Sequence, residues 1–426
     1  MTSPATPSGQ KLALEGGTPA VRHRLPPMYP GGMRIAQEEE AAVLRVLRSK
    51  RLFRYYGPEE GPSEVAELER SFSERLGTAH ALAVSSGTTA LASALAALGV
   101  GPGDEVIVPA YTWIATAAAV TAVGAVPVVA EVDDSLTLDP ADAESRITER
   151  TRVLLPVHMR GAPADMDAIL DLARRHGLRV LEDAAQALGA SYHGRRLGTI
   201  GDAGAYSLQF NKILTAGEGG MVATDDRVLH ERALMYHDVA ASQRSELDPG
   251  QTFVGITCRM SELQGAVARV QLERLEEILS TMRTRKGAIK EGIADVARDH
   301  EVEFRRLNDE AGDAALALIL LLPNVAQARY AAEALAAEGV RGANLFQRDR
   351  RDYHVAYHWA PILDQRSWSE TTPWDRHPAP VRNDPETWPN SLDLLERSLQ
   401  VHVSPELSEE QAEEVTTALR KVLGSL

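Results

Sequence analysis

One stretch of the chain, residues 178–224, carries the residue types needed for chemistry on an aldehyde cofactor. Asp183 ends a short apolar run, Lys212 lies in a polar turn, and the glycine-rich sequence GEGG follows at residues 217–220. A lysine amine can form a Schiff base with an aldehyde. A carboxylate can keep a pyridine nitrogen protonated, so that the ring accepts electrons. The two side chains therefore indicate a site for pyridoxal 5'-phosphate (PLP).

The strand pattern predicts where these groups lie. Residues 179–181 have the pattern of a buried strand, and Asp183 follows at its carboxyl end, the edge at which open parallel α/β sheets bind ligands. Gln186 comes three residues later, so that both side chains can face one site. Ser207 lies in the next strand pattern, residues 203–208, and comes five residues before Lys212.

A second turn has the composition of an anion site. The sequence SSGTTA at residues 85–90 lies between a short apolar strand at 80–84 and a helix that runs to about Gly99. Backbone N–H groups and the helix dipole bind anions at such a junction. We assign the turn to the PLP phosphate, with Gly87 and Thr88 as donors; the alternative is a plain serine or threonine N-cap.

Composition limits the partners and the location. The 426 residues carry a net charge of -15 without a basic run, so we expect neither nucleic acid nor an anionic membrane as a partner. The single cysteine, Cys258, excludes an intrachain disulfide and fits a reducing compartment. The polar first residues, MTSPATPSGQ, do not resemble a signal peptide, and we expect a cytoplasmic protein.

A pair of histidines could in principle bind a metal ion. His354 and His358 are four residues apart, which on a helix suits zinc. No third ligand is evident, and Pro361 follows closely, which works against a helix there. We therefore expect no metal site.

The core stretch also carries a family resemblance. The sequence EDAAQALGASYHGRRLGTIGDAGAYSLQFNKILTAGEGGMVATDD, residues 182–226, resembles the active-site signature of the DegT–StrS group of sugar aminotransferases. These are PLP enzymes of fold type I, in the aspartate aminotransferase superfamily. The match is long and ordered, so it is far more specific than a short motif. The alternative is a buried aspartate and a surface lysine on an ordinary α/β sheet.

The resemblance implies the fold. A large domain, residues 16–265, would hold a mostly parallel seven-stranded sheet between helices, and residues 266–426 would form a smaller C-terminal α/β domain. Residues 1–15 are expected to be disordered. From the apolar pattern we also predict one long helix from Met260 to about Gly292, and a closing helix over residues 391–399.

The resemblance also assigns roles around the cofactor. Lys212 is the catalytic lysine, Asp183 holds the ring nitrogen, and Gln186 lies near the ring hydroxyl. Ser207 joins Gly87 and Thr88 at the phosphate. Trp113 takes the position of an aromatic that stacks on the pyridine ring; the alternative is a core tryptophan.

A later segment implies a homodimer with active sites at the interface. GITCRMSELQGAV, residues 255–267, resembles the family's GYNYRMSELQAA, which usually crosses the dimer interface so that its Asn reaches the neighbour's cofactor phosphate. Thr257 replaces that Asn, and a hydroxyl can still donate. Arg259 is retained and could bind a carboxylate or phosphate.

Three further residues are candidates for substrate contacts. Tyr56 lies in a segment that borders the substrate entrance in the family, although it could equally be a packing aromatic. Arg160 replaces a frequent Tyr, and could pair with an anionic substrate group or be solvated. His354 lies where the family has a substrate-facing, histidine-rich segment.

The activity implied by the resemblance is amino transfer. Glutamate or glutamine would supply the amino group, and a keto-sugar or keto-cyclitol would accept it, in amino-sugar or antibiotic biosynthesis. One alternative is another PLP reaction, such as dehydration or cyclisation, but the dehydratase branch replaces the lysine by histidine. The other is a PLP-bound sensor or an inactive partner subunit.

Overall fold

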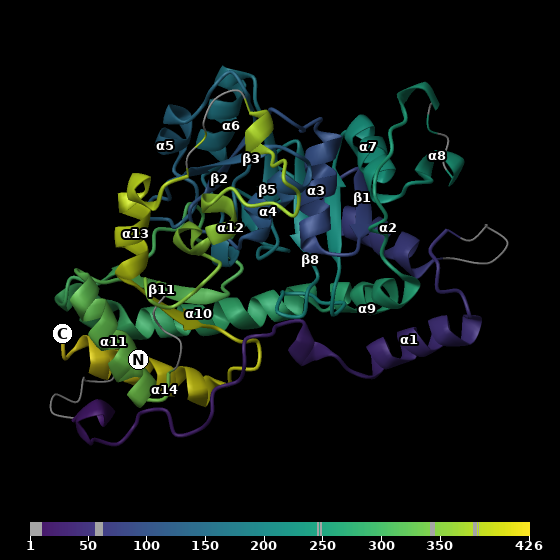
Figure 1. The fold of residues 1–426 in the computed structure, drawn as a ribbon. Coiled ribbons are helices and arrows are strands. Elements are labelled where there is room, and N and C mark those ends of the chain that lie inside the picture. Colours follow the sequence, from purple (N-terminus) through teal and green to yellow (C-terminus); the bar gives the residue numbers. More distant parts are fainter. Residues whose placement is uncertain are drawn as a thin grey trace.

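The protein is organised around one large sheet (Figure 1). The structure, a computed structural model, describes residues 11–55, 63–244, 247, 249–340, 346–377, 381 and 383–426. Within these residues the sheet has seven strands, which are, in spatial order, β1 (His80–Val84), β9 (Gly220–Thr224), β8 (Ala203–Ser207), β5 (Arg179–Asp183), β4 (Thr151–Leu154), β2 (Glu105–Pro109) and β3 (Val126–Ala130). Only β9 in this sheet is antiparallel to its neighbours, so the predicted mostly parallel seven-stranded sheet is confirmed.

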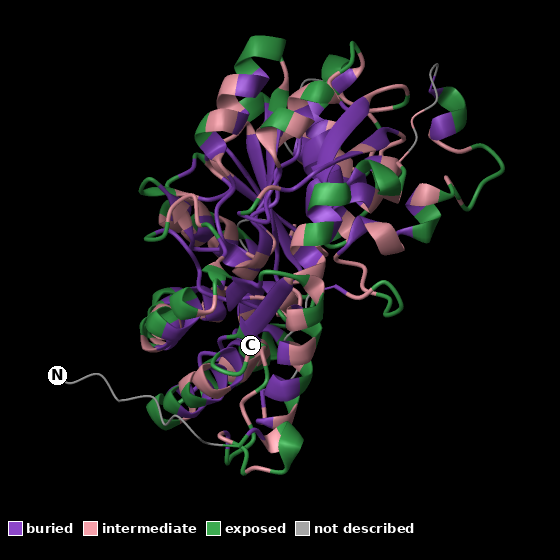
Figure 2. Ribbon diagram, turned by 90° about the vertical axis from the view of Figure 1, so that its left-hand side faces the viewer, coloured by how far each residue is buried: buried purple, intermediate pink, exposed green. Residues whose placement is uncertain are grey.

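Helices cover both faces of this sheet because its strands are apolar on both sides. The helices of this part of the chain are α1 (Gln37–Ser49), α2 (Glu64–Leu76), α3 (Gly87–Ala97), α4 (Ala115–Ala122), α5 (Pro140–Ser145), α6 (Met166–His176), α7 (Arg227–His237), α8 (Ala241–Arg244) and α9 (Glu262–Glu273), of which α1 packs on α9 and α8 on α7. Short 3-10 turns and a hairpin connect them: η1 (Ala13–Glu15), η2 (Gly32–Arg34), η4 (Met159–Gly161), η5 (Pro249–Gln251), β6 (Ser191–Tyr192) and β7 (Arg195–Arg196). Figure 2 shows the sheet fully buried between helices whose outer faces are exposed.

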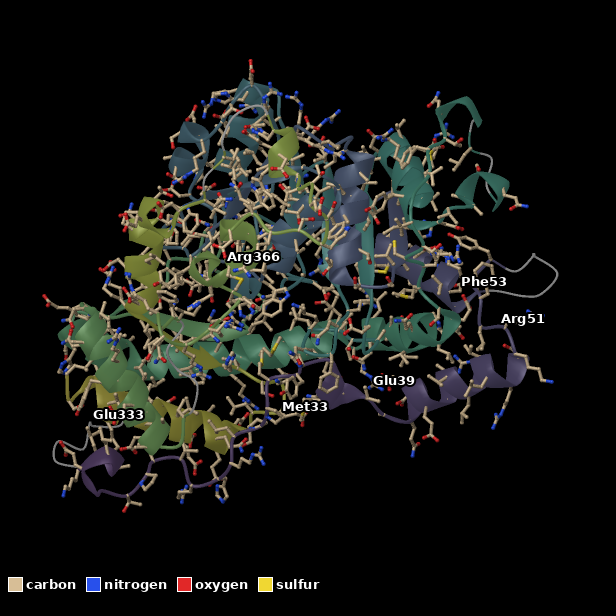
Figure 3. The ribbon with its side chains drawn as sticks, viewed as in Figure 1. Met33, Glu39, Arg51, Phe53, Glu333 and Arg366 are labelled. Atoms are coloured by element: carbon tan, nitrogen blue, oxygen red, sulfur yellow. The ribbon has the colours of Figure 1, made fainter. Side chains whose placement is uncertain are left out.

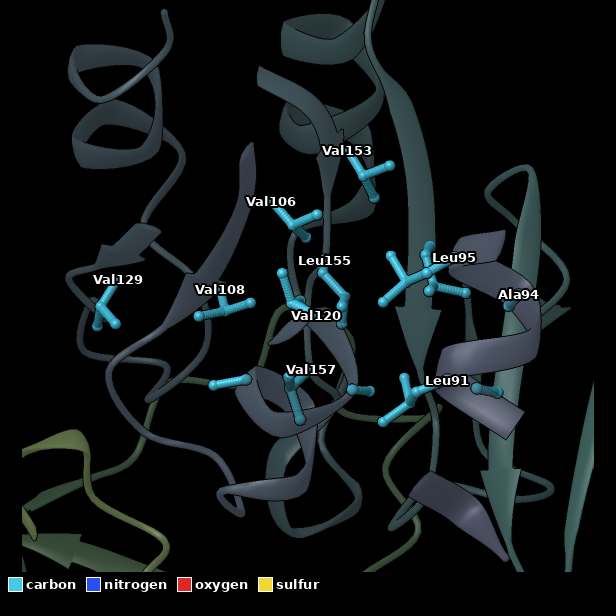
Figure 4. Close-up of a cluster of buried hydrophobic side chains, with 14 of the residues drawn as sticks. Leu91, Ala94, Leu95, Val106, Val108, Val120, Val129, Val153, Leu155 and Val157 are labelled. Carbon is cyan, nitrogen blue, oxygen red and sulfur yellow. The ribbon is translucent and has the colours of Figure 1, made fainter. Parts of the chain in front are cut away.

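Each face of the sheet has its own core. Leu91 and Leu95 of α3 pack against Val106 and Val108 of β2 in one cluster, part of which Figure 4 shows. The side chain of Ile107 points to the opposite face and belongs to the second cluster, with α2, α6 and α9. Side chains alternate along a strand, so a single strand can serve both cores. Full burial of each such side chain contributes about 1.5–3 kcal/mol.

The helix predicted from Met260 to Gly292 is two helices. α9 begins at its N-cap Ser261, whose side chain and that of Gln264 form a capping box, and α10 (Leu275–Asp299) continues after Arg274. Glu39 of α1, labelled in Figure 3, is buried and accepts hydrogen bonds from Gln271 Nε2 (2.8 Å) and Arg274 Nε (2.9 Å). This contact joins α1 to the junction of α9 and α10.

A smaller sheet forms the C-terminal part. Among the described residues it consists of β10 (Glu303–Phe304), β11 (Ala317–Leu321) and β12 (Ser398–His402), all antiparallel. The helices α10, α11 (Val325–Ala337) and α14 (Glu409–Leu423) surround a core that includes the outer face of this sheet.

The prediction of a helix over residues 391–399 is wrong at its end. α13 (Pro389–Glu396) stops before Arg397, and the following residues form β12. Leu399 and Val401 lie in the small core, with Gln400 between them on the other face. Pairing with β11, nearly eighty residues earlier in the chain, decides this conformation, and no local pattern reveals it.

The packing differs from the expected division of the chain at both ends. Leu12 lies within the segment expected to be disordered, yet it is buried in the small core, and the Ala13 N–H donates to Glu338 Oε1 (2.8 Å). That expectation is therefore wrong for residues 11–15; residues 1–10 lie outside the described part. The boundary at residue 265 remains a prediction.

The segment from residue 346 to 395, assigned to the small domain, packs largely into the core of the large sheet. Trp359 and Trp388 are fully buried there. Its short elements are η6 (Ala356–His358), α12 (Ala360–Leu363), η7 (Trp374–Arg376) and η8 (Pro385–Thr387). Asn383 covers the edge strand β3: its Nδ2 donates to Pro127 O (2.8 Å), and its Oδ1 accepts from Val129 N (3.0 Å).

No helix in the described ranges is both long and apolar enough to cross a bilayer.

Replacing Asn383 by Ala removes both hydrogen bonds to β3. We expect the free energy of unfolding to fall by about 1–2 kcal/mol, because a strand N–H and a carbonyl lose their partners at a partly buried edge. Asn390→Ala is the matched control, since Asn390 is exposed and only its backbone is hydrogen-bonded. Denaturant unfolding of the three proteins measures the difference; equal losses in both variants would contradict the role of Asn383.

Candidate active site

Asp183 lies at the carboxyl end of β5 and is almost completely buried. Its Oδ2 accepts a hydrogen bond from Thr116 Oγ1 (2.8 Å), and its Oδ1 accepts from the N–H of Ala185 (3.1 Å). Burial raises the pKa of Asp183, while the hydrogen bond from Thr116 and the nearby charge of Lys212 oppose that rise. Thr116, at the start of α4, was missed in the sequence because nothing local relates it to a strand 67 residues later.

Lys212 lies in the turn between β8 and β9, beside the N-terminal segment, whose Gly31 N–H donates to Lys212 O (3.1 Å). Burial lowers the pKa of the Lys212 amine to about 8; Asp183 opposes this shift, and Arg160 adds to it. The structure therefore brings together the two residues on which the PLP prediction rests. A lysine with this pKa is partly neutral near pH 7, as a nucleophile must be.

The predicted phosphate turn is the N-terminus of α3. Ser86 is the N-cap and accepts from the N–H of Thr89 (3.1 Å), so the N-cap alternative holds for this residue. The amides of Gly87 and Thr88 come before that of Thr89 in the helix. Neither donates a hydrogen bond to an acceptor among the described residues. Both interpretations of the turn are compatible, because the cap leaves the first amides for an anion.

Glycine is required around this turn because other segments of the same chain approach it closely. A Cβ atom on Gly87 would lie 2.7 Å from Ser207 Cβ, and one on Gly220 would lie 2.2 Å from Ser86 O. The end of β8 and the start of β9 thus meet the start of α3, and Ser207 lies beside the free amides. Together with Lys212 and Asp183, this arrangement fits the phosphate, aldehyde and ring nitrogen of PLP.

Gln186 and Arg160 are joined to each other. The Arg160 N–H donates to Gln186 Oε1 (3.1 Å), and Arg160 Nε donates to Tyr111 Oη (3.2 Å). Arg160 has a left-handed backbone with φ of 58°, which is uncommon for a residue other than glycine. Its position near Lys212 is thus held at both backbone and side chain. The role of Gln186 at the ring hydroxyl remains a prediction.

Trp113 and His354 form the other side of the site. Trp113 is 44% exposed, so the alternative of a core tryptophan is wrong. The centroid of its ring lies 4.9 Å from that of the His354 ring. The Thr112 N–H donates to His354 O (2.9 Å), which holds the C-terminal segment against the loop after β2. His354 Nδ1 lies 2.8 Å from Asp352 Oδ1. Burial lowers the pKa of His354, and Lys212 and Arg160 contribute to the lowering.

Two candidates in the segment 255–267, which is predicted to lie at a dimer interface, have different surroundings. Thr257 is exposed, as an interface donor would be in an isolated chain. Arg259 pairs with buried Asp238 (Nη1 to Oδ1, 2.5 Å) and lies over the ring of Phe53. Arg259 is therefore already neutralised inside the chain, which weakens the prediction that it binds substrate. Tyr56 lies outside the described residues.

His158 and Glu182 form a buried pair behind the site. His158 Nε2 lies 2.9 Å from Glu182 Oε2, and His158 Nδ1 accepts from the Ala164 N–H (3.1 Å). Glu182 also accepts from the amides of three residues of the turn after β7 (Gly198, Ile200 and Gly201). These bonds hold the end of β5, and with it Asp183.

The two histidines considered for zinc do not act together. His354 contacts Asp352, whereas His358 Nε2 contacts Gln347 O (3.2 Å). Elsewhere, His23, Glu410 and Glu414 could geometrically surround an ion, but Arg22 already pairs with both carboxylates. The absence of a metal remains a prediction. A cavity of about 620 Å³ between α4 and residues 361–376 contains none of the predicted site residues.

Comparison with known families gives one match that covers most of the chain. Residues 33–361 match the model of the DegT/DnrJ/EryC1/StrS aminotransferase family.

Individual proteins are similar to this chain in sequence and in structure. GDP-perosamine synthase of Caulobacter vibrioides is 45% identical over 225 residues, 51% of this chain and 58% of that protein. The L-glutamine:2-deoxy-scyllo-inosose aminotransferase of Streptomyces lividus is 42% identical over 296 residues, 67% of this chain and 68% of that protein. The chain thus matches less than two thirds of the first relative's length. The crystal structure of 3-amino-5-hydroxybenzoic acid synthase has 28% identity and a TM-score of 0.78, and covers 96% of this chain and 100% of its own.

The lowered pKa of Lys212 predicts how its amine reacts in the cofactor-free protein. Only the neutral amine is nucleophilic, so labelling by an amine-specific reagent should rise with pH and reach half its maximum near pH 8, not near the 10.5 of an ordinary lysine. Asp183→Asn should move the midpoint lower, because the anion that favours the charged amine is removed. Mass spectrometry of the labelled peptide between pH 6 and roughly pH 10 measures both; an upward shift in the variant would refute the pairing.

Gly87→Ala should weaken PLP binding by roughly tenfold or more, since the new Cβ would meet Ser207 and displace the phosphate turn. The matched control is Gly287→Ala, in the middle of α10, where a Cβ would meet nothing within 4 Å. The control should leave PLP affinity unchanged and raise the free energy of unfolding by about 0.5–1 kcal/mol. Titration of the cofactor-free proteins with PLP tests this, and equal affinities for both variants would argue against a phosphate site.

Proposed function

Because the chain belongs to the DegT/DnrJ/EryC1/StrS aminotransferase family, we propose that it transfers an amino group from L-glutamine or L-glutamate to a keto-cyclitol or keto-sugar. The family's cofactor is PLP, which when bound supplies an aldehyde and an electron-accepting ring. The observation that carries the proposal is the buried Lys212 amine, with its pKa near 8, beside the carboxylate of Asp183.

Each residue of the site then has a stated task. Lys212 Nζ would hold the cofactor covalently, and as a free amine it could take up and return a proton at the substrate carbon. Asp183, fixed by Thr116, would face the ring nitrogen of the cofactor. Ser207 and the first amides of α3 hold the phosphate. Trp113 covers one side of the ring and keeps water away.

The relatives support a particular pair of substrates. The relative from Streptomyces lividus takes L-glutamine and 2-deoxy-scyllo-inosose by its name, and its match covers about two thirds of each chain. GDP-perosamine synthase is instead named for a nucleotide-linked product, and its match is shorter. We therefore place glutamine and a keto-cyclitol first, and a nucleotide-linked keto-sugar second, in an amino-sugar or antibiotic pathway.

The oligomeric state and location belong to the same proposal. We place the enzyme in the cytoplasm, as a homodimer in which Thr257 reaches the neighbouring cofactor phosphate. The exposure of Thr257, together with that of Val254 (89%) and Ile256 (46%), supports an interface at this segment. A monomer in sedimentation analysis that is fully active would refute the dimer.

Spectroscopy tests the reaction one half at a time. Glutamine or glutamate should bleach the Schiff-base absorption band of the PLP form, and a keto-cyclitol should restore it. Lys212→Ala should abolish the band, whereas Lys290→Ala, on the outside of α10, should keep it. Restoration by a keto-cyclitol but not by nucleotide-linked keto-sugars would decide the substrate class.

The same experiment separates the alternatives. A band that no amino acid bleaches would favour a PLP-bound sensor or an inactive partner subunit. Loss of water from the sugar without amino transfer would favour a dehydratase.

A further inference from the structure

The turn that carries Arg160 is hydrogen-bonded directly to the end of β5. The His158 N–H donates to Asp183 O (3.1 Å), and the Gly161 N–H donates back to His158 O (3.2 Å). The Arg160 N–H donates to Gln186 Oε1 (3.1 Å), three residues after Asp183. These bonds place the turn η4 beside the two side chains that are predicted to meet the cofactor ring.

The guanidinium of Arg160 has two donor groups to spare. Its Nε donates to Tyr111 Oη (3.2 Å), whereas neither Nη1 nor Nη2 has a hydrogen-bond partner among the described residues. The side chain is partly exposed, and neither Nη atom is enclosed by the protein, so that a ligand can reach them. Such a guanidinium can bind a carboxylate through two hydrogen bonds.

Two groups from the C-terminal part of the chain hold this turn on both sides of Arg160. Arg305, the residue after β10, donates from Nη1 to Met159 O (2.9 Å). The Ala314 N–H donates to Gly161 O (3.0 Å). Arg160 itself has a left-handed backbone, which is an unfavourable conformation for its side chain. The contacts from residues 305 and 314 therefore stabilise the conformation in which Arg160 is presented.

Arg305 is a costly residue in this position. Its side chain is 7% exposed, burial lowers its pKa to about 10, and its Nη2 is enclosed without a partner among the described residues. The charge of Asp313 acts on it, but Asp313 Oδ2 already accepts from Lys286 Nζ (2.5 Å). Well-packed apolar residues often stabilise a protein as much as buried ions do, or more. Stability is thus a poor explanation for an arginine here, and its hydrogen bond to the turn is a better one.

We propose that Arg160 binds the α-carboxylate of the amino donor, and that Arg305 is a positioning residue that holds Arg160 for this contact. The inference rests on the proposed function and names a subsite of it. Glutamine and glutamate share the α-carboxylate, whereas a keto-cyclitol is uncharged, so the guanidinium serves the first half-reaction. Arg305 also adds positive charge behind Arg160, which favours an anion in a protein whose net charge is -15.

The test measures the binding of 2-methyl-L-glutamine to the PLP form through the change in its absorption band. A methyl group replaces the Cα hydrogen of this amino acid, so it binds but cannot pass on its amino group. We expect Arg160→Met to raise the dissociation constant roughly tenfold to a hundredfold, as for lost hydrogen bonds to a charged group, and Arg305→Met to raise it about fivefold. KM for the keto-cyclitol should stay within about twofold in both variants.

Two comparisons separate positioning from a general loss of stability. If Arg305 acts through Arg160, Arg305→Met should add little to the loss in protein that already carries Arg160→Met, because residues that act as a unit are not additive. Arg232→Met is the matched control. Arg232 also donates to two main-chain carbonyls, Ala96 O (3.1 Å) and Ala97 O (2.7 Å), and its replacement should leave the dissociation constant unchanged.

An analogue identifies the group that is bound. The α-amide of 2-methyl-L-glutamine should bind the original protein more weakly than the acid, and it should bind Arg160→Met as well as the acid does. If Arg305→Met fails to fold, Arg305→Lys takes its place. A lysine can still reach one of the carbonyls, so its loss of affinity should be smaller and should again vanish beside Arg160→Met.

Each part of the inference has an outcome that would overturn it. Unchanged binding in Arg160→Met, or an amide that binds the original protein as well as the acid, would overturn the carboxylate subsite. Losses that add up in the double variant, or an equal loss in Arg232→Met, would overturn the role of Arg305. An original protein whose absorption band no amino acid changes would instead refute the proposed function.

Discussion

The rest of the structure depends on one constraint, which is to hold an amine and a carboxylate near each other inside the protein. Burial disfavours the charged form of each: it lowers the pKa of Lys212 and raises that of Asp183. Their mutual attraction offsets part of that cost. The parallel sheet supplies Asp183 at a strand end, and the turn after a neighbouring strand supplies Lys212.

Close packing of the backbone around Gly87 and Gly220 also shapes the site. The start of α3, the end of β8 and the start of β9 meet at Gly87 and Gly220, where no Cβ atom fits. The arrangement leaves helix amides free beside Ser207, and these amides supply positive charge in a protein whose net charge is -15. The positive charge that this turn offers to an anion is thus a local property of the backbone.

The small C-terminal part completes the site from the other side. Residues 352–355 lie against the loop after β2 and bring His354 to Trp113, while Arg305 holds the turn that carries Arg160. Arg259, by contrast, is neutralised by Asp238, so Arg160 is the better-placed guanidinium for an anionic substrate. The predicted cofactor side of the site is built from the central sheet, and the predicted substrate side from segments distant in the chain.

The sequence by itself determined the seven-stranded sheet and the family, and it predicted the residues of the cofactor side. Lys212, Asp183 and Ser207 lie within one ordered stretch, where strand and turn patterns relate them directly. Only the tertiary structure decided the partner of Arg259, the contact of Thr116 with Asp183, the strand conformation of β12 and the contact of Arg305 with the turn that carries Arg160. Each of these joins residues that are far apart in the chain, or that pair across a sheet, and no local periodicity encodes which distant segments will share a core. The same reason explains why Leu12 is ordered: its burial depends on helices that come three hundred residues later.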